Sequence, residues 1–147
     1  MHTPARDTAR TMSQENVKLM RRVLEAFNSG DPDTVAEFAH PEGQMEENNS
    51  VFPGLDRVYV GPEGFRQWYQ TVVVEAWEDF RVDVEELRAL DYEQVLVHAR
   101  LRARGRQSGV EVDMPTFQIF GVKDGMVARR RLYFTEAEAL EAAGLSQ

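Results

Sequence analysis

The chain has 147 residues, a length typical of one domain, and its 42% hydrophobic content is ordinary for a globular protein. It contains no cysteine, which excludes disulfides, thiolate chemistry and cysteine-bound metal. The formal net charge of −8 disfavours non-specific binding to nucleic acid or anionic membranes. No apolar run approaches the roughly 18 residues of a membrane helix, and the N-terminus lacks the apolar core of a secretory signal. We therefore expect a cytoplasmic protein.

Residues 1–12 are polar and show no periodicity, so they are predicted to form a disordered N-terminal extension. The first helix is expected to begin at Ser13, a residue type favoured at the N-cap position. An apolar stripe with helical spacing follows, formed by Val17, Met20, Leu24 and Phe27. Gly30 is expected to end this helix. The folded domain is predicted to cover residues 13–147.

A second, shorter helix is predicted directly after the first, so that the two form a hairpin. Asp31 is a suitable cap, and Pro32 fits the first helical position. A short strand is then expected over residues 43–49, followed by a loop over residues 49–61. The third helix opens at Gly61, and its broad apolar face consists of Phe65, Trp68, Tyr69, Val72 and Val73.

After Trp77 the apolar period changes to two, which is typical of strands. Strands are predicted over residues 80–87, 95–103, 110–122 and 126–134, and the Asp-Gly pair at residues 124–125 is a strong hairpin signal. A capping box at residues 135–138 begins a last helix. Helices first and hairpin-connected strands afterwards predict an α+β fold with a mostly antiparallel sheet, not alternating βαβ units.

Three segments, taken in order, carry a resemblance to a known family. They are Val17 to Asp31 (VKLMRRVLEAFNSGD), Tyr59 to Phe65 (YVGPEGF) and Lys123 to Val127 (KDGMV). Their joint order and spacing resemble SnoaL-like members of the nuclear transport factor 2-like superfamily, over residues 13–145. The resemblance implies a cone-shaped fold in which a strongly curved sheet packs against the N-terminal helices around a pocket. It also implies frequent homodimers through the open face of the sheet.

Known activities on this fold include polyketide cyclisation, ketosteroid isomerisation and epoxide hydrolysis, while other members only bind or scaffold. The fold alone therefore does not select a function. Glu47 resembles in position the carboxylate base of ketosteroid isomerases. On the predicted strand it shares a face with Met45, and desolvation in an apolar pocket would raise its pKa toward that of a general base. The alternative is that Glu47 and Glu46 form a solvated acidic pair on an edge strand.

Two reactions of the family lack their expected machinery in this chain. Ketosteroid isomerisation needs a Tyr and a protonated Asp to stabilise the enolate oxygen. The resemblance places Val23 and Phe117 at those positions, and neither side chain donates a hydrogen bond. An epoxide hydrolase would need an Asp-Arg-Asp set, and Leu132 stands where one of its members is expected.

Asp113 and Arg130 remain as candidate carboxylate and guanidinium groups for catalysis or binding. Asp113 has a simpler interpretation, because it can pair across a hairpin with Arg102 and Arg104. Such exposed cross-strand pairs contribute only a few tenths of a kcal/mol each.

Gln118 is a candidate for orienting a ligand through its side-chain amide. Strict alternation from Val110 turns Gln118 inward, whereas the family resemblance turns Phe117 and Ile119 inward instead. A β-bulge near Pro115 would reconcile the two interpretations, and the sequence leaves both open.

The histidines give no signal for a metal site. His98 lies inside a predicted strand, but on the same face as Arg100 and Arg102, which is the outer and possible dimer face. His2 and His40 lie in the N-terminal segment and at a helix end. No group of His, Asp and Glu has ligand spacing, so neither a metal nor another cofactor is predicted.

Aromatic residues from the third helix and the late strands predict the lining of an apolar pocket. They are Trp68, Tyr69, Trp77, Phe117, Tyr133 and Phe134. The alternative is that these rings simply fill the interior. The predicted catalytic residues are Glu47 and Asp113. The predicted ligand-binding residues are Met45, Trp68, Tyr69, Trp77, Phe117, Gln118, Arg130, Leu132 and Phe134.

Three functions are compatible with this pattern. The first is an isomerase or cyclase that acts on a small apolar organic molecule by acid-base chemistry, with Glu47 as the base. The second is a protein that binds such a molecule without turning it over. The third is a dimeric interaction domain whose arginine-rich sheet face makes the contacts.

Overall fold

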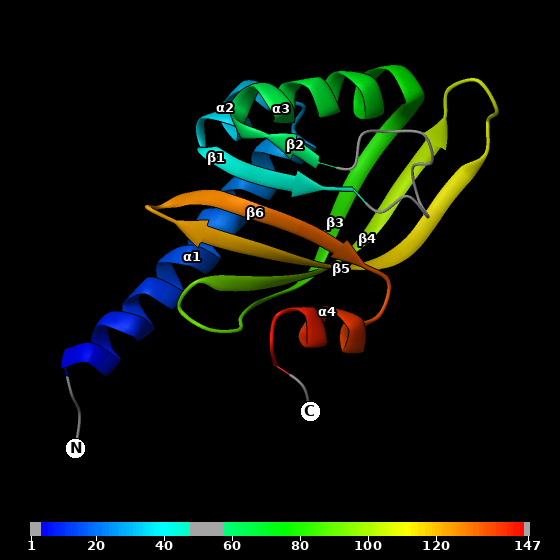
Figure 1. Cartoon of the computed structure of the whole chain (residues 1–147). Coiled ribbons are helices and arrows are strands. Elements are labelled where there is room, and N and C mark those ends of the chain that lie inside the picture. The colour runs from blue at the N-terminus through cyan, green and yellow to red at the C-terminus, as the bar shows by residue number, and fades with distance from the viewer. Residues whose placement is uncertain (1–3, 48–57, 146–147) are drawn as a thin grey trace.

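A six-stranded sheet with the strand order β2-β1-β6-β5-β4-β3 carries the fold (Figure 1). The computed structural model describes residues 4–47 and 58–145. The elements are α1 (Pro4–Asn28), α2 (Pro32–Glu37), β1 (Ala39–Glu46), β2 (Val58–Val60), α3 (Gly61–Trp68), the π-helix η1 (Tyr69–Ala76), β3 (Trp77–Ala89), β4 (Gln94–Gly105), β5 (Glu111–Lys123), β6 (Met126–Tyr133) and α4 (Glu136–Ala142).

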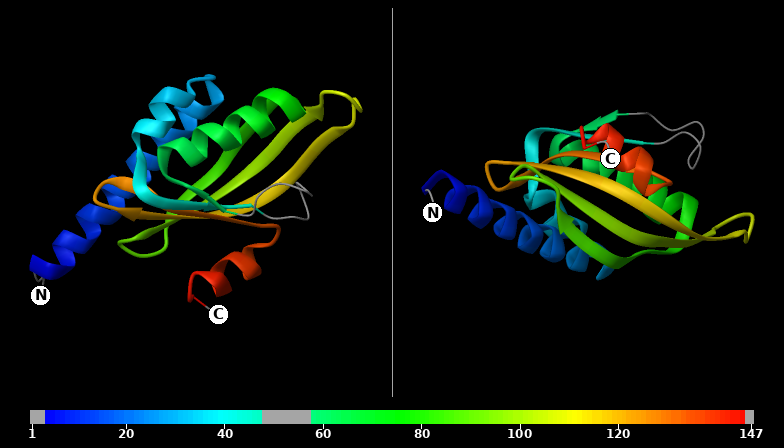
Figure 2. Two further views of the ribbon diagram at one scale, coloured as in Figure 1. Left: turned by 45° about the horizontal axis from the view of Figure 1, so that its top comes forward. Right: turned by 90° about the horizontal axis from the view of Figure 1, so that it is seen from below.

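The sheet is antiparallel except for one pair, β1 and β6, which run parallel. The long strands bend strongly, and α1, α3 and η1 lie on one face while α4 lies on the other (Figure 2). The prediction of an α+β cone with a curved, mostly antiparallel sheet is confirmed. No helix within the described residues is long and apolar enough to cross a membrane.

The first helix begins at Pro4, so the predicted start at Ser13 is wrong and residues 4–12 are helical instead of irregular. Side chains inside the helix fix it to the turn between β3 and β4. The Ser13 hydroxyl donates to the Asp91 carbonyl at 3.2 Å, and the Asn16 amide donates to the Tyr92 carbonyl at 2.8 Å. The N-terminal part of α1 extends past the sheet (Figure 1), and for this reason its sequence carries no apolar stripe. Residues 1–3 lie outside the described part.

The second helix and the start of the sheet follow the expected order with shifted bounds. The Asp31 carboxylate caps α2 by accepting from the Thr34 backbone N–H at 3.1 Å, as predicted. The first strand begins at Ala39, earlier than expected, because Ala39 pairs with Val127 on β6. Part of the predicted loop forms the short strand β2, which pairs with β1. Residues 48–57 of the predicted strand and loop lie outside the described residues.

Two apolar clusters fill the two sides of the sheet. The larger one joins α1, α3 and η1 to the inner face of the sheet and includes Met20, Val72 and Val97, all fully buried. The smaller one lies under α4 and consists of Leu96, Ile119 and Ala139, with partly buried rings beside them. The helices α1, α3 and η1 therefore pack on the inner face of the sheet, and α4 covers part of the outer face.

The side chain of Asn28 joins the end of α1 to the free edge of β3. Its Nδ2 donates to the Val82 carbonyl at 2.8 Å, and its Oδ1 accepts from the Val82 N–H at 3.0 Å. The amide thus takes the place that a neighbouring strand would have at this residue. Both backbone groups would lose their partner if the amide were removed.

We expect Asn28→Ala to lower the free energy of unfolding by about 1–3 kcal/mol, because a partly buried donor and acceptor are left unpaired. Urea denaturation followed by circular dichroism measures the change. Ser29→Ala is the matched control, since the Ser29 hydroxyl donates to the Glu25 carbonyl on the exposed side of the same turn. Its effect should stay within about 0.5 kcal/mol. Equal losses in the two variants would show that Asn28 has no special role at the sheet edge.

Candidate active site

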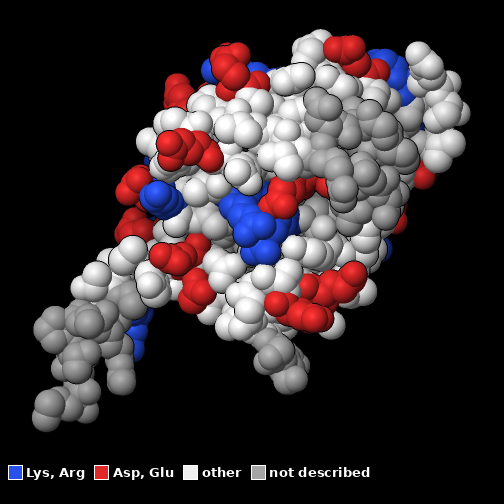
Figure 3. Space-filling model, in the orientation of Figure 1, with Lys and Arg blue, Asp and Glu red and all other residues white. Residues whose placement is uncertain are grey.

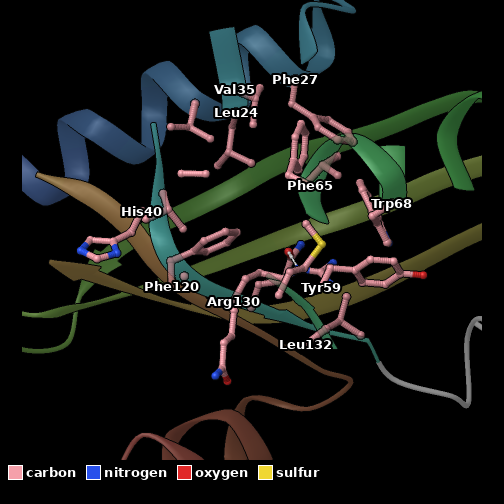
Figure 4. Close-up of a pocket in the computed structure, with 18 of the residues that line it drawn as sticks. Leu24, Phe27, Val35, His40, Tyr59, Phe65, Trp68, Phe120, Arg130 and Leu132 are labelled. Carbon is pink, nitrogen blue, oxygen red and sulfur yellow. Dashed lines mark hydrogen bonds between the residues drawn. The ribbon is translucent and has the colours of Figure 1, made fainter. Parts of the chain in front are cut away.

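A cavity of about 110 Å³ lies between the helices and the inner face of the sheet (Figure 4). Residues from α1, α2 and α3 form its roof, and residues from β1, β5 and β6 form its floor. Its lining is Val23, Leu24, Phe27, Val35, Ala39, His40, Gly43, Gln44, Met45, Tyr59, Gly61, Phe65, Trp68, Phe80, Val82, Leu101, Gln118, Phe120, Val127, Arg130 and Leu132.

The apolar part of the cavity follows directly from helix and strand periods. Leu24 and Phe27 stand on one face of α1, and Phe65 and Trp68 on one face of α3, at the spacing that brings side chains onto one side of a helix. The Phe27 and Trp68 rings pack at 6.0 Å between centroids, and Phe65 packs on Trp68 at the same distance. The roof is therefore a continuous aromatic surface.

The polar end of the cavity is built around Arg130 on β6. Its Nε donates to the Gln118 Oε1 at 3.1 Å, and its Nη1 donates to the Glu47 Oε1 at 2.5 Å. The side chains of Arg130 and Glu47 are only 11% and 1% exposed, so this is a buried ion pair. Strand pairing explains why Arg130 contacts both Glu47 and Gln118. Arg130 lies opposite Met45 on β1 and Phe120 on β5, and each of these is two residues away from the contacting side chain.

A chain of hydrogen bonds continues from Arg130 into the sheet. The Gln118 Nε2 donates to the Thr116 Oγ1 at 3.5 Å, and the Thr116 hydroxyl donates to the Ala99 carbonyl at 3.1 Å. Gln118 and Thr116 are both buried. This chain fixes the Gln118 amide with its oxygen toward Arg130, and so fixes the orientation of the guanidinium group.

The ring of Trp68 lies beside the same end. Its indole Nε1–H is buried and has no hydrogen-bond partner among the described residues. The guanidinium carbon of Arg130 lies 5.8 Å from the Trp68 ring centroid, which is within cation–π range. A buried donor without a partner costs about 1–3 kcal/mol.

Other titratable groups near the cavity are occupied elsewhere. The His40 Nδ1 accepts from the Glu42 backbone N–H at 3.1 Å, its Nε2 lies 3.4 Å from Asp124, and its ring points away from Trp68 and Leu132 (Figure 4). Burial, and to a lesser extent the negative charge of Asp31, raises the pKa of Tyr69, so its hydroxyl stays protonated at neutral pH. Within the described lining, Arg130 is the one arginine or lysine, and neither Asp nor Glu is present.

Five of the predicted ligand-binding residues line this cavity: Met45, Trp68, Gln118, Arg130 and Leu132. The predicted catalytic residue Glu47 lies on the inner face, as Met45 does, and is buried. The solvated alternative for Glu47 does not occur. Its carboxylate is not isolated in an apolar environment either, because Arg130 pairs with it.

Gln118, not Phe117, points inward, as strict alternation along β5 predicts. The pairing of β4 with β5 continues through Pro115 without a register shift, so no β-bulge is present there. Phe117 lies on the outer face and stacks on His98 with 4.4 Å between ring centroids. It packs with Tyr133 against the cluster under α4, so both rings are remote from the cavity.

The remaining predicted residues also lie away from the cavity. Tyr69 and Trp77 pack on the periphery of the larger apolar cluster, and Phe134 is half-buried after β6. Asp113 lies on the outer face, where the Nε atoms of Arg100 and Arg102 are 2.9 and 3.8 Å from its carboxylate. The predicted cross-strand pairing is confirmed for Arg102, whereas Arg104 pairs with Glu78 and Asp79 instead, and Asp113 does not reach the site.

Five aromatic residues of the lining were not identified from the sequence as pocket residues. They are Phe27, Tyr59, Phe65, Phe80 and Phe120. The signal for Phe120 was present, because alternation places it on the same face as Gln118. Tyr59 could not be placed, since its strand β2 was expected to be a loop. Phe27 and Phe65 were seen only as members of apolar helix faces.

The fold and the cavity define a small-molecule pocket protein with an apolar interior and hydrogen-bond donors at one end. Residues 20–130 match the family model described as the SnoaL-like domain, and the chain belongs to this family. Membership implies that a small organic molecule is the partner of the pocket.

Similar proteins of named function support the same family. Aklanonic acid methyl ester cyclase DnrD of Streptomyces peucetius is 35% identical over 106 residues, which cover 67% of this chain and 63% of that protein. Aklanonic acid methyl ester cyclase AcmA of Streptomyces galilaeus is 36% identical over 110 residues, covering 72% of this chain and 69% of that protein. The chain thus spans slightly less than two thirds of the length of DnrD.

A solved structure is similar in fold. A candidate polyketide cyclase from Xanthomonas campestris pv. campestris superposes with a TM-score of 0.72 at 19% identity. The superposition covers 88% of this chain and 97% of the other. At this level of identity the similarity concerns the fold.

We expect Arg130→Met to lower the free energy of unfolding by about 3–5 kcal/mol, because it leaves the Glu47 carboxylate buried without its partner. The double variant Arg130→Met, Glu47→Met should recover most of this loss, since two apolar side chains replace two charges. Chemical denaturation of the wild type, both single variants and the double variant gives the coupling energy. Additive losses would contradict a direct buried pair.

Proposed function

We propose that the protein is a SnoaL-like cyclase that closes a ring in an apolar organic substrate through an enolate. The observation that carries the proposal is the buried pair of Glu47 and Arg130 at the polar end of an aromatic cavity. It puts a carboxylate beside hydrogen-bond donors, the combination that proton abstraction next to a carbonyl group needs. The two Streptomyces relatives named as cyclases support a ring-closing reaction.

In the proposed mechanism, Arg130 and Gln118 form the polar end that receives a carbonyl oxygen of the substrate, with the guanidinium N–H groups as donors. Glu47 removes a proton from the carbon beside that carbonyl, and the electron pair moves onto the oxygen to give an enolate. The enolate carbon then attacks a second carbonyl carbon of the same molecule. The alkoxide so formed takes up the proton, and the product is an isomer of the substrate.

The donors in this scheme replace the Tyr and Asp pair whose absence from the sequence argued against ketosteroid isomerisation. Removing one preorganised donor from such a site typically lowers the rate by about 10²–10³-fold.

Proton abstraction can be tested without knowledge of the natural substrate. We expect the wild-type protein to catalyse deuterium incorporation into the CH₂ groups of 2-indanone in D₂O, measured by proton NMR. Glu47→Gln should reduce this exchange by at least about 100-fold, because a general base contributes about 10²–10⁴-fold. Glu47→Gln should also slow the ring closure of aklanonic acid methyl ester, which chromatography measures.

Glu46→Gln is the matched control for this experiment. Glu46 neighbours Glu47 and also pairs with an arginine, Arg129, at 2.8 Å, but this pair lies on the surface. Figure 3 shows basic side chains gathered over β6 with acidic ones beside them. The control variant should exchange 2-indanone at the wild-type rate. Undiminished exchange in Glu47→Gln would exclude Glu47 as the base.

A non-catalytic binding protein is the second candidate function. It is favoured by the position of Glu47, whose carboxylate is held by Arg130 and is not itself among the residues that line the cavity. In that case 2-indanone would bind and raise the unfolding temperature, since a ligand at about 100 times its Kd adds roughly 2.7 kcal/mol. The protein would nevertheless catalyse no exchange.

We further propose that two copies pair through the outer face of β3, β4 and β5. Figure 2 shows these strands beyond the area that α4 covers. The stacked rings of His98 and Phe117 lie there, among charges of both signs such as Arg102 and Asp83, whose Nε and Oδ2 atoms are 3.4 Å apart. A face with alternating charges can complement itself across a two-fold axis.

Sedimentation equilibrium should give twice the mass of the chain for the wild type. His98→Asp should shift the mass toward one chain, because it adds a negative charge beside Glu85 near the centre of the face. Gln70→Asp, on the exposed side of η1, is the control and should leave the mass unchanged. A wild-type mass of one chain at all concentrations would exclude this dimer.

A further inference from the structure

The charge balance at the polar end of the cavity restricts what can bind there. Arg130 is the one Lys or Arg in the described lining, and its Nη1 already has the Glu47 carboxylate at 2.5 Å. The pair is buried and carries no net charge. His40, at the other end of the cavity, lies beside Asp124.

A ligand carboxylate at this position would bring a second negative charge to one guanidinium group. The complex would then hold a net negative charge among aromatic and aliphatic side chains, and the desolvation of that charge would not be offset. A carbonyl oxygen adds no net charge. It can accept from the guanidinium group of Arg130, which lines the cavity.

We infer that the cavity selects the neutral carbonyl oxygen of a ketone or ester and rejects carboxylates, and that Glu47 sets this specificity. The inference rests on the proposed function in taking this cavity as the substrate site. It adds the chemical class of the group that is recognised at the polar end.

The Glu47–Arg130 pair interacts differently with the bound ketone and with the enolate formed from it. Before reaction the substrate and the ion pair are each neutral. When the proton moves from the substrate carbon to Glu47, the carboxylate becomes neutral and the negative charge passes to the substrate oxygen beside Arg130. The total charge of the site is unchanged. Arg130 therefore interacts more strongly with the enolate than with the bound ketone, the difference on which catalysis depends.

The size of the cavity determines suitable probes. Its volume of about 110 Å³ is slightly below the roughly 150 Å³ of an engineered cavity that binds benzene. One six-membered ring is therefore the natural probe, and a larger ring system must extend beyond the cavity or displace side chains. Acetophenone and benzoate have almost the same shape and differ in charge, so their comparison isolates the electrostatic effect.

The experiment is an NMR titration of the 147-residue chain with each probe, observed at the indole N–H resonance of Trp68. Trp68→Phe assigns this resonance by distinguishing it from that of Trp77. For the wild type we expect acetophenone to shift the Trp68 signal with at least about tenfold higher affinity than benzoate. The expected factor corresponds to a charge interaction over several ångströms in a partly buried site.

Glu47→Gln tests the proposed cause of the preference. A glutamine side chain can still accept from the Arg130 Nη1, but it leaves the positive charge of Arg130 without an anion. The ratio of benzoate to acetophenone affinity should rise by at least about tenfold. Glu46→Gln removes an exposed carboxylate from the neighbouring residue and should leave the ratio at its wild-type value.

Three outcomes would overturn the inference. These are equal or tighter binding of benzoate by the wild type, an unchanged ratio in Glu47→Gln, and no shift of the Trp68 resonance with either probe. Because the wild-type comparison needs no variant, the first and third outcomes remain decisive if Glu47→Gln fails to fold. Exchange of 2-indanone together with a preference for benzoate would refute the inference alone. A preference for acetophenone without any exchange would refute the cyclase function alone.

Discussion

The parallel pairing of β1 with β6 is the constraint on which the site depends. The other strand pairs of the sheet are antiparallel, and most of them are linked by hairpins. The β1–β6 pair joins the first strand of the described chain to the last, and it sets Met45 opposite Arg130. The inner side of this junction brings a carboxylate and a guanidinium group together although they are far apart in sequence. Without this register Arg130 would face the cavity with no carboxylate beside it.

A buried ion pair adds little net stability to a domain. The desolvation of Glu47 and Arg130 offsets much of their attraction, and well-packed apolar residues often serve stability as well or better. The hydrogen bonds from Arg130 to Gln118, and from Gln118 to Thr116, hold the guanidinium group in one orientation. Because the guanidinium group also lines the cavity, this arrangement fits the binding of a ligand oxygen better than it fits core packing.

Much of the fold could be predicted from the sequence because it follows from local periods. Alternation along β5 correctly placed Gln118 inward, whereas the position inferred from the family resemblance placed Phe117 there and was wrong. The face shared by Met45 and Glu47 was correct for the same reason. The pairing of Glu47 with Arg130 depends on strand register across the whole sheet, and no local pattern encodes it.

The start of α1 was predicted wrongly for a different physical reason. Its N-terminal part extends past the sheet and needs no apolar stripe, and the Ser13 side chain bonds to the carbonyl of Asp91 instead of capping the helix. Similarly, the strand β2 was predicted as a loop because three residues are too few to show a period. Aromatic residues were recognised as a group, but only strand register decided which of them face inward.

The amide of Asn28 has a consequence for how copies of this protein can associate. It occupies the backbone groups of Val82 on β3, a strand at one border of the sheet, while the strand at the opposite border, β2, is only three residues long. Val82 on β3 therefore offers no free N–H or C=O group, and β2 is too short for a long, continuous row of them, which is what strand-by-strand growth into fibres requires. Loss of that amide would therefore do more than weaken the domain, because it would uncover a place where a foreign strand could add.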